Sequence, residues 1–90
     1  MISKTTNKFW KCYKPLLKAI KKYAKESFTL FKKDPNYPGL NFKKVHKKLP
    51  VFSVRITSDY RALGIVKENE ILWFWIGTHN DYENIIKKSY

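Results

Sequence analysis

The chain has 90 residues, enough for one domain around a single core but not for a second domain, so it acts on a surface or a shallow cleft. It carries 19 lysines and arginines against 7 aspartates and glutamates, a formal net charge of +12. Such a charge favours nucleic acid, or an acidic partner protein that neutralises it, and alone does not choose between them. A single cysteine, Cys12, excludes an intrachain disulfide.

Membrane and metal signals are weak. The start, MISKTTNKFW, lacks the apolar stretch of a secretory signal, and the longest apolar run, residues 71–76, has six residues where a membrane span needs roughly 20. Two histidines 33 residues apart and one cysteine make a poor zinc site. We therefore expect a cytoplasmic protein that binds neither membrane, metal nor cofactor.

Helices are predicted in the N-terminal third. Apolar residues between positions 9 and 31 recur at spacings of three and four, with lysines on the opposite face, as in amphipathic helices. Pro15 suits the first turn of a helix, so we expect a short helix over residues 7–14 and a longer one over 15–33, paired as an antiparallel hairpin. Residues 34–40, DPNYPGL, form a loop, and a short strand is expected within residues 41–45.

A three-stranded meander is predicted from Val51 onward, and its register follows from keeping one face apolar. A three-residue connection over residues 57–59 places Arg55 opposite Arg61. A two-residue connection would instead put Arg61 among the apolar side chains of the preceding strand, so it is rejected. The two arginines should then share one face of the sheet.

The second turn, around residues 68–69, pairs Val66 with Ile71. It sets Gly64 across from Trp73 and Ala62 across from Trp75, small residues opposite large ones. The face away from the helices then carries five apolar side chains: Leu63, Ile65, Leu72, Phe74 and Ile76. Because the helical hairpin covers only one face, this second face must be covered by the C-terminal segment, residues 81–90, or by a partner.

Six motifs occur in a specific order along the chain. They are Phe9-Trp10, Asp34-Pro35 with Pro38-Gly39-Leu40, Phe42-Lys43-Lys44, Ser53-Val54-Arg55, Asp59-Tyr60-Arg61-Ala62-Leu63-Gly64, and Trp73-Phe74-Trp75-Ile76-Gly77-Thr78-His79 with Tyr82. In this combination nearly the whole chain resembles the RelE/ParE superfamily of type II toxin–antitoxin toxins. The resemblance implies a single α+β domain over residues 1–90, neutralised by a cognate antitoxin.

The fold implied is an N-terminal helical hairpin packed on a three- to four-stranded antiparallel sheet, with a short C-terminal helix. Only residues 1–5 precede the helices, so the family's usual first strand is nearly absent. We therefore expect the sheet to have a short edge or to lack one strand.

RelE-like members of this superfamily bind the ribosomal A site and cleave mRNA, whereas ParE-like members poison DNA gyrase. RNA cleavage without a metal requires activation of the 2′-OH, stabilisation of charge on the phosphorane and protonation of the 5′-oxygen. The candidate catalytic residues are Arg61, His79, Arg55 and Tyr82. Arg61 matches the arginine of the family's Tyr-Arg strand, and His79 resembles a histidine that several RelE relatives carry there. Arginine suits phosphate oxygens, and imidazole exchanges a proton near neutral pH.

The expected binding residues fall into two groups. The RNA contacts are Lys43, Lys44, His46, Lys47 and Lys48, which would position RNA without reading its sequence. The antitoxin contacts are the five apolar residues of the second sheet face. Structural alternatives exist for each group: lysines on a merely soluble face, arginines as solvated strand residues, His79 as the start of the last helix, and Tyr82 as a packed side chain.

Three functions remain open on the sequence. The favoured one is a ribosome-dependent mRNA endoribonuclease, with the ribosome, mRNA and an antitoxin as partners. The others are a ParE-like toxin that inhibits DNA gyrase by protein binding, and a non-catalytic basic module that binds RNA or an antitoxin. The histidine after the last strand favours the first, because a protein-binding poison needs no proton-transfer group.

Overall fold

The computed structural model describes residues 1–89, and the side chains of residues 1–88. The elements follow the order β1 (Ile2–Thr5), α1 (Asn7–Tyr13), α2 (Lys18–Lys33), a 3-10 turn η1 (Pro38–Leu40), β2 (Lys43–Lys44), β3 (Val51–Arg55), β4 (Tyr60–Lys67), β5 (Glu70–Thr78) and α3 (His79–Ser89). The predicted α+β class, with two N-terminal helices and a C-terminal helix, is confirmed. Tyr90, the end of the predicted C-terminal segment, lies outside the described residues. Within the described chain no helix combines the length and the apolar character that crossing a membrane requires.

All five strands form one mixed sheet in the order β1-β5-β4-β3-β2. β1 runs parallel to β5, and the other neighbours are antiparallel. The sheet therefore has five strands where three or four antiparallel strands are predicted, and β1 forms the short edge that was one of the two expected outcomes. Every side chain of β1 is exposed, so its sequence carries no apolar alternation that could have revealed it.

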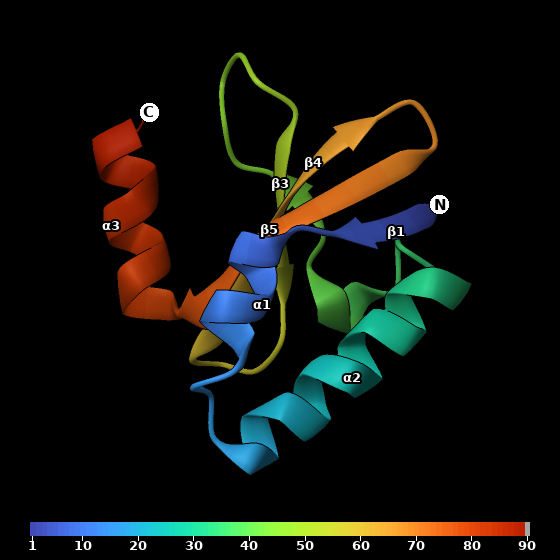
Figure 1. Cartoon of the computed structure of the whole chain (residues 1–90). Coiled ribbons are helices and arrows are strands. Elements are labelled where there is room, and N and C mark those ends of the chain that lie inside the picture. The colour runs from blue at the N-terminus through green and yellow to red at the C-terminus, as the bar shows by residue number, and fades with distance from the viewer. Residues whose placement is uncertain (90) are drawn as a thin grey trace.

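The two N-terminal helices begin differently: α1 has a side-chain cap and α2 does not. Thr6 caps α1, because its hydroxyl oxygen accepts a hydrogen bond from the backbone N–H of Phe9 at 3.1 Å. α2 begins at Lys18 rather than at Pro15, because Leu17 has an extended backbone, with ψ of 149°. α1 and α2 run in opposite directions about their connection but splay apart, and α2 and α3 lie on opposite sides of the sheet (Figure 1).

Two hydrophobic cores lie on the two faces of the sheet. The larger core packs side chains of α1 and α2 against the sheet and includes Phe9, Ala24, Phe31, Val54, Ala62, Ile71, Trp73 and Ile76. The smaller core packs α3 against the other face and includes Val51, Leu63, Trp75 and Tyr82. We refer to these sides as the α2 face and the α3 face. The C-terminal helix therefore covers part of the second face, as one of the two predicted alternatives required.

The predicted register is confirmed at three places: Arg55 pairs with Arg61, Val66 with Ile71, and Gly64 with Trp73. Between them a β-bulge shifts the pairing of β4 with β5, so that Leu63 pairs with Trp75. The prediction that Ala62 lies across from Trp75 is therefore wrong, since Ala62 pairs with Ile76. Phe74 is the extra residue, and beyond it Trp75 turns to the α3 face and Ile76 to the α2 face.

Gly64 makes the close packing beside this bulge possible. A Cβ atom at this position would lie 2.7 Å from Cγ1 of Ile71 and 2.9 Å from Cε3 of Trp73. These distances are shorter than the contacts that packed side chains make. Any larger residue at position 64 would therefore push the side chains of Ile71 and Trp73 away. The glycine thus lets Ile71 and Trp73 cover β4 directly.

Candidate functional site

Two arginines lie side by side on the α3 face, at the end of the sheet next to the turn of residues 57–59. Arg55 is exposed and Arg61 is half-buried. Burial lowers the pKa of Arg61 below its usual value, and the charge of Arg55 lowers it further, while Tyr82 and Asp59 act in the opposite direction. Two neighbouring guanidinium groups, one partly desolvated, favour the binding of an anion between them.

The side chain of Arg61 is fixed by its own turn. Its Nη1 donates to the carbonyl oxygen of Thr57 at 2.6 Å and to that of Tyr60 at 2.9 Å. No hydrogen bond joins its Nη2 or Nε to the described residues. The guanidinium is therefore held in place by one nitrogen and keeps other donors for phosphate oxygens.

His79 is the first residue of α3 and lies at the same end of the sheet. Its backbone N–H donates to the carbonyl oxygen of Asp59, which ties the end of β5 to the turn of residues 57–59. The imidazole is 42% exposed, and its Nε2 lies 3.5 Å from Oε1 of Glu83. The cap of α3 is Thr78, whose hydroxyl oxygen accepts from the backbone N–H of Asp81 at 3.1 Å. The side chain of His79 is therefore not required to start the helix.

Tyr82 links the arginines to the histidine. Its ring centroid lies 5.6 Å from that of His79, and Tyr82 acts to raise the pKa of Arg61. The residue is only 8% exposed and packs in the smaller core with Leu63 and Trp75. The structure thus gives Tyr82 a clear packing role between the two groups.

A hollow of about 450 Å³ adjoins His79 and is lined by Asp59, Tyr60, Thr78, His79 and Asn80. Neither Arg55 nor Arg61 lines it, so the structure brings the histidine to the same end of the sheet as the arginines without placing all three in one hollow. Asp59 and Thr78, which line this hollow, are not among the site residues predicted from the sequence. The available signal was the position of Thr78 directly before a helix, where threonine is a favoured cap.

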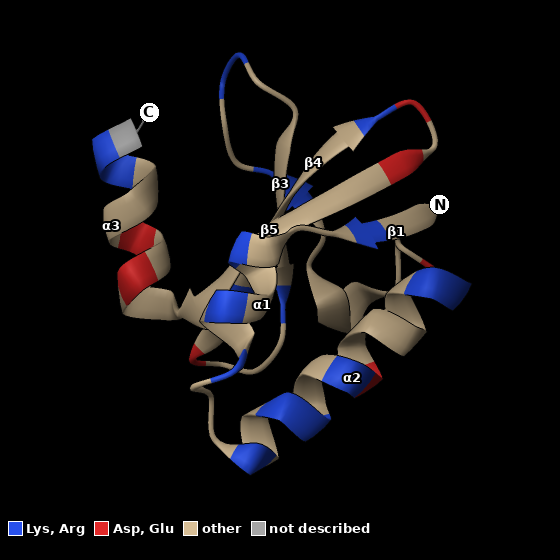
Figure 2. Ribbon diagram, in the orientation of Figure 1, with Lys and Arg blue, Asp and Glu red and all other residues tan. Residues whose placement is uncertain are grey.

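The five predicted RNA contacts do not form one surface with the arginines. Lys43 pairs with Ser53, which shares a strand face with Arg55, whereas Lys44 pairs with Phe52 on the α2 face. The other three lie in the loop of residues 45–50, at the opposite end of β3 from Arg55, roughly 13 Å away along the strand. In Figure 2 the lysines of this loop stand apart from the turn of residues 57–59, and further lysines line α2.

His46 organises the lysine loop. Its Nδ1 accepts hydrogen bonds from the backbone N–H groups of Lys48, at 2.9 Å, and of Leu49, at 2.8 Å. This ring nitrogen must be unprotonated to accept, so the proton of the neutral imidazole lies on Nε2. His46 therefore shapes the loop that carries Lys47 and Lys48, both of which are exposed.

Two of the five predicted antitoxin contacts are core residues. Leu63 is fully buried under α3, and Ile76 is 2% exposed because the bulge turns it to the α2 face. The prediction that Ile76 lies on the α3 face is wrong, whereas Leu63 lies on that face as predicted and is covered there by α3. Ile65 and Leu72, which pair across β4 and β5, are 41% and 40% exposed, and Phe74 is half-buried. We call Ile65, Leu72 and Phe74 the apolar patch.

Metal-binding clusters are absent from the described residues, in the sense that no three or more His, Cys, Asp or Glu side chains gather where an ion could be held. Arg55 and Arg61, which pair across β3 and β4, form a cationic pair on the α3 face.

A comparison with protein families finds one family model that matches most of the chain. The family model of the ParE-like toxin domain matches residues 18–84, more than half of the chain. No curated protein matches it. The following solved structures share its fold.

YafQ from E. coli superposes with a TM-score of 0.72 at 14% identity, covering 89% of this chain and 94% of that one. The RelB-RelE antitoxin-toxin complex from Methanococcus jannaschii gives 0.70 at 17% identity, covering 90% and 95%. The YoeB/ParE toxin from Agrobacterium tumefaciens gives 0.69 at 15% identity, covering 88% and 99%. At these identities the likeness is one of fold.

Proposed function

The chain belongs to the ParE-like toxin domain family, within the RelE/ParE superfamily of toxin–antitoxin toxins, and we propose that it is an endoribonuclease that cleaves translated mRNA on the ribosome. The observation that carries the proposal is the placement of Arg55, Arg61, Tyr82 and His79 as successive neighbours at one end of the sheet. This combination supplies positive charge for a phosphate and an exposed imidazole for proton transfer. The reaction takes place in the cytoplasm, where ribosomes translate mRNA.

In the proposed reaction the 2′-hydroxyl of the RNA gives its proton to water as its oxygen attacks the adjacent phosphorus, and the bond from phosphorus to the 5′-oxygen breaks. The products are a 2′,3′-cyclic phosphate and a 5′-hydroxyl end, so no water is consumed in this step. Arg61, supported by Arg55, stabilises the negative charge on the phosphorane. Stabilisation of this kind is usually the largest single contribution to the rate enhancement of an enzyme. His79 transfers the proton that the 5′-oxygen acquires. Tyr82 positions α3 and the imidazole rather than reacting, because its ring is buried.

We also propose that the protein binds a cognate antitoxin. One structural neighbour is a toxin in complex with its antitoxin, RelB-RelE from Methanococcus jannaschii. On this chain the apolar patch is the surface that an antitoxin would cover, since paired exposed apolar side chains on a sheet face typically mark interaction sites. The net charge of +12 predicts that the antitoxin segment is acidic.

Induction of the chain in a bacterium tests the proposal. Growth arrest should come with new 5′-hydroxyl ends mapped inside translated regions of mRNA, and an inhibitor that clears ribosomes from mRNA should abolish them. The alternative from the same family is poisoning of DNA gyrase. Arrest with intact mRNA and double-strand DNA breaks would replace the ribonuclease by that alternative, and RNA cleavage without ribosomes would contradict the ribosome requirement.

A further inference from the structure

A second concave region lies on the α2 face, on the opposite side of the sheet from the arginines. It is a cavity of about 530 Å³ between β1, α1 and α2. Small-molecule sites in proteins typically measure about 300–1,000 Å³. Five of the side chains that line it are aromatic: Phe9, Trp10, Tyr13, Phe28 and Trp73. A cavity with such walls suits a flat ring.

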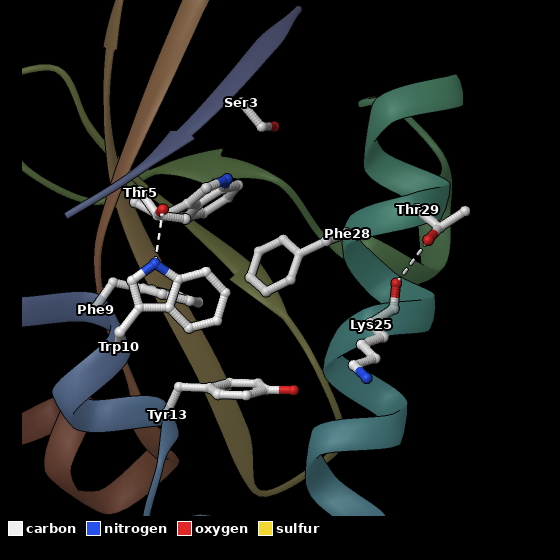
Figure 3. Close-up of a pocket in the computed structure, with 9 residues that line it drawn as sticks. Ser3, Thr5, Phe9, Trp10, Tyr13, Lys25, Phe28 and Thr29 are labelled. Carbon is white, nitrogen blue, oxygen red and sulfur yellow. Dashed lines mark hydrogen bonds between the residues drawn. The ribbon is translucent and has the colours of Figure 1, made fainter. Parts of the chain in front are cut away.

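The arrangement of the walls is visible in Figure 3. Phe28 projects from α2 toward Trp10 of α1, with Ser3 of β1 at one end of the cavity and Tyr13 and Lys25 toward the other. Trp10 is 45% exposed and Phe28 is half-buried, so both rings offer a free surface to a ligand. Aromatic side chains placed in this way bind nucleobases by stacking, whatever the base.

One buried polar atom of a residue that lines the cavity has no hydrogen-bond partner. The indole Nε1 of Trp73 is buried and donates no hydrogen bond within the described residues. By contrast, Nε1 of Trp10 donates to Oγ1 of Thr5 at 2.9 Å. A buried N–H without an acceptor is unfavourable, and native structures contain few of them. A ligand with a hydrogen-bond acceptor in its ring would satisfy this donor.

The charge of the cavity is positive. Lys25 is the charged residue that lines it, and no aspartate or glutamate does so among the described residues. Lys21, one turn earlier on the same helix, has its Nζ 5.5 Å from the ring centroid of Tyr13. This end of the cavity therefore favours an anion, and lysines at such positions commonly contact phosphate.

We propose that this cavity binds a nucleobase together with its neighbouring phosphate. On binding, the half-buried ring of Phe28 turns aside, and the base stacks between this ring and Trp10. An acceptor on the base then meets Nε1 of Trp73. Lys25 binds the phosphate. The same chemistry is offered by a free 5′-mononucleotide and by a base turned out of an RNA chain. The site uses neither Arg61 nor His79, so it goes beyond the proposed cleavage reaction and stands or falls independently of it.

The three tryptophans provide both the reporters of binding and a control within one spectrum. Each gives one indole N–H signal in a ¹H–¹⁵N spectrum, and Trp75 lies in the smaller core on the other face of the sheet. Titration with each 5′-mononucleotide should shift the signals of Trp10 and Trp73 and leave that of Trp75 in place. A shift with mononucleotides identifies the free nucleotide as a sufficient ligand. A shift that requires a short oligoribonucleotide, titrated into Arg61→Ala to remove binding at the candidate site, identifies an RNA chain.

Two variants and one probe sharpen the result. Trp73→Phe keeps an aromatic ring but removes the donor, and it should weaken binding about tenfold while the other two indole signals show an intact fold. Lys25→Ala should weaken binding about fivefold, whereas Lys32→Ala, a lysine of the same helix that does not line the cavity, should not.

Phenyl phosphate has the ring and the phosphate but no ring acceptor, so it should leave the Trp73 signal unmoved. Unmoved Trp10 and Trp73 signals with every nucleotide, a shift confined to Trp75, or an equal response to phenyl phosphate would overturn the proposal.

Discussion

Trp73 and Trp75 lie two positions apart in β5, yet their side chains are buried in different cores on opposite faces of the sheet. In a regular strand, residues at this spacing share a face. The bulge at Phe74 separates them, so that Trp73 packs under α1 and α2 and Trp75 packs under α3. One residue more or less at this position would therefore move the side chains of β5 that follow it to the other face of the sheet.

Gly64→Ala tests the close packing beside this bulge. The added Cβ meets the side chains of Ile71 and Trp73 within 3 Å, so we expect a loss of about 1–3 kcal/mol in the free energy of unfolding. Gly39→Ala is the matched control, because its Cβ would meet only the exposed ring of Tyr37, at 3.2 Å. Denaturant titrations of both variants measure the difference. Equal stability of the two would mean that Gly64 is not needed for this packing.

Arg61→Ala should reduce the rate of mRNA cleavage on ribosomes by on the order of 100-fold or more, because it removes a fixed cation from the phosphorane. Arg61→Lys should restore only part of the rate, since lysine cannot donate to the turn and to phosphate with one planar group. Single-turnover cleavage assays give the rates. The control is Lys67→Ala, an exposed residue at the far end of β4. Wild-type cleavage by Arg61→Ala would exclude the arginine from the reaction.

His79→Ala should lower the cleavage rate by roughly 100-fold to 10,000-fold through loss of proton transfer. The fold should remain, because the backbone N–H to Asp59 and the Thr78 cap do not involve the imidazole. Asn80→Ala, which lines the same hollow, serves as the control and should retain activity. Thermal melts must accompany the rates. If the two variants lose activity equally, the hollow matters as a surface and the imidazole has no special part.

The apolar patch can be tested by charge. Ile65→Lys combined with Leu72→Lys should abolish or strongly weaken antitoxin binding while leaving stability and cleavage unchanged, because both side chains are about two-fifths exposed. Leu17→Lys, at a 70% exposed leucine between α1 and α2, should bind antitoxin normally. Co-purification and titration calorimetry measure the affinity. Normal binding by the double variant would place the antitoxin elsewhere on the toxin.

Sequence patterns predicted the parts of this fold that depend on periodicity. The spacing of apolar residues identified both N-terminal helices, and the rule of one apolar face placed Arg55 opposite Arg61. The bulge could not be predicted, because it depends on how two tryptophans fit over Gly64 in three dimensions. That single irregularity explains why Ile76 lies on the α2 face instead of the predicted α3 face, whereas Leu63 lies on the predicted face and is covered by α3.

In the candidate site, too, some features follow from sequence patterns and others depend on tertiary packing. Residue types and turn length brought the arginines and His79 to one end of the sheet, but the packing of Tyr82 and the distance of the lysine loop depend on tertiary structure. β1 was nearly missed for a different reason, since an exposed edge strand has no hydrophobic pattern and is recognised only through its partner.

The pairing of β1 with β5 joins the first strand of the chain to the last, from Ile2 opposite Glu70 to Thr5 opposite Trp73. Contacts so distant in sequence form late, because a long loop must close before they contribute. During synthesis β1 emerges well before β5, so it has no strand partner until β5 has been made. The sheet that carries both arginines is therefore incomplete until β5 has been made and has paired with β1.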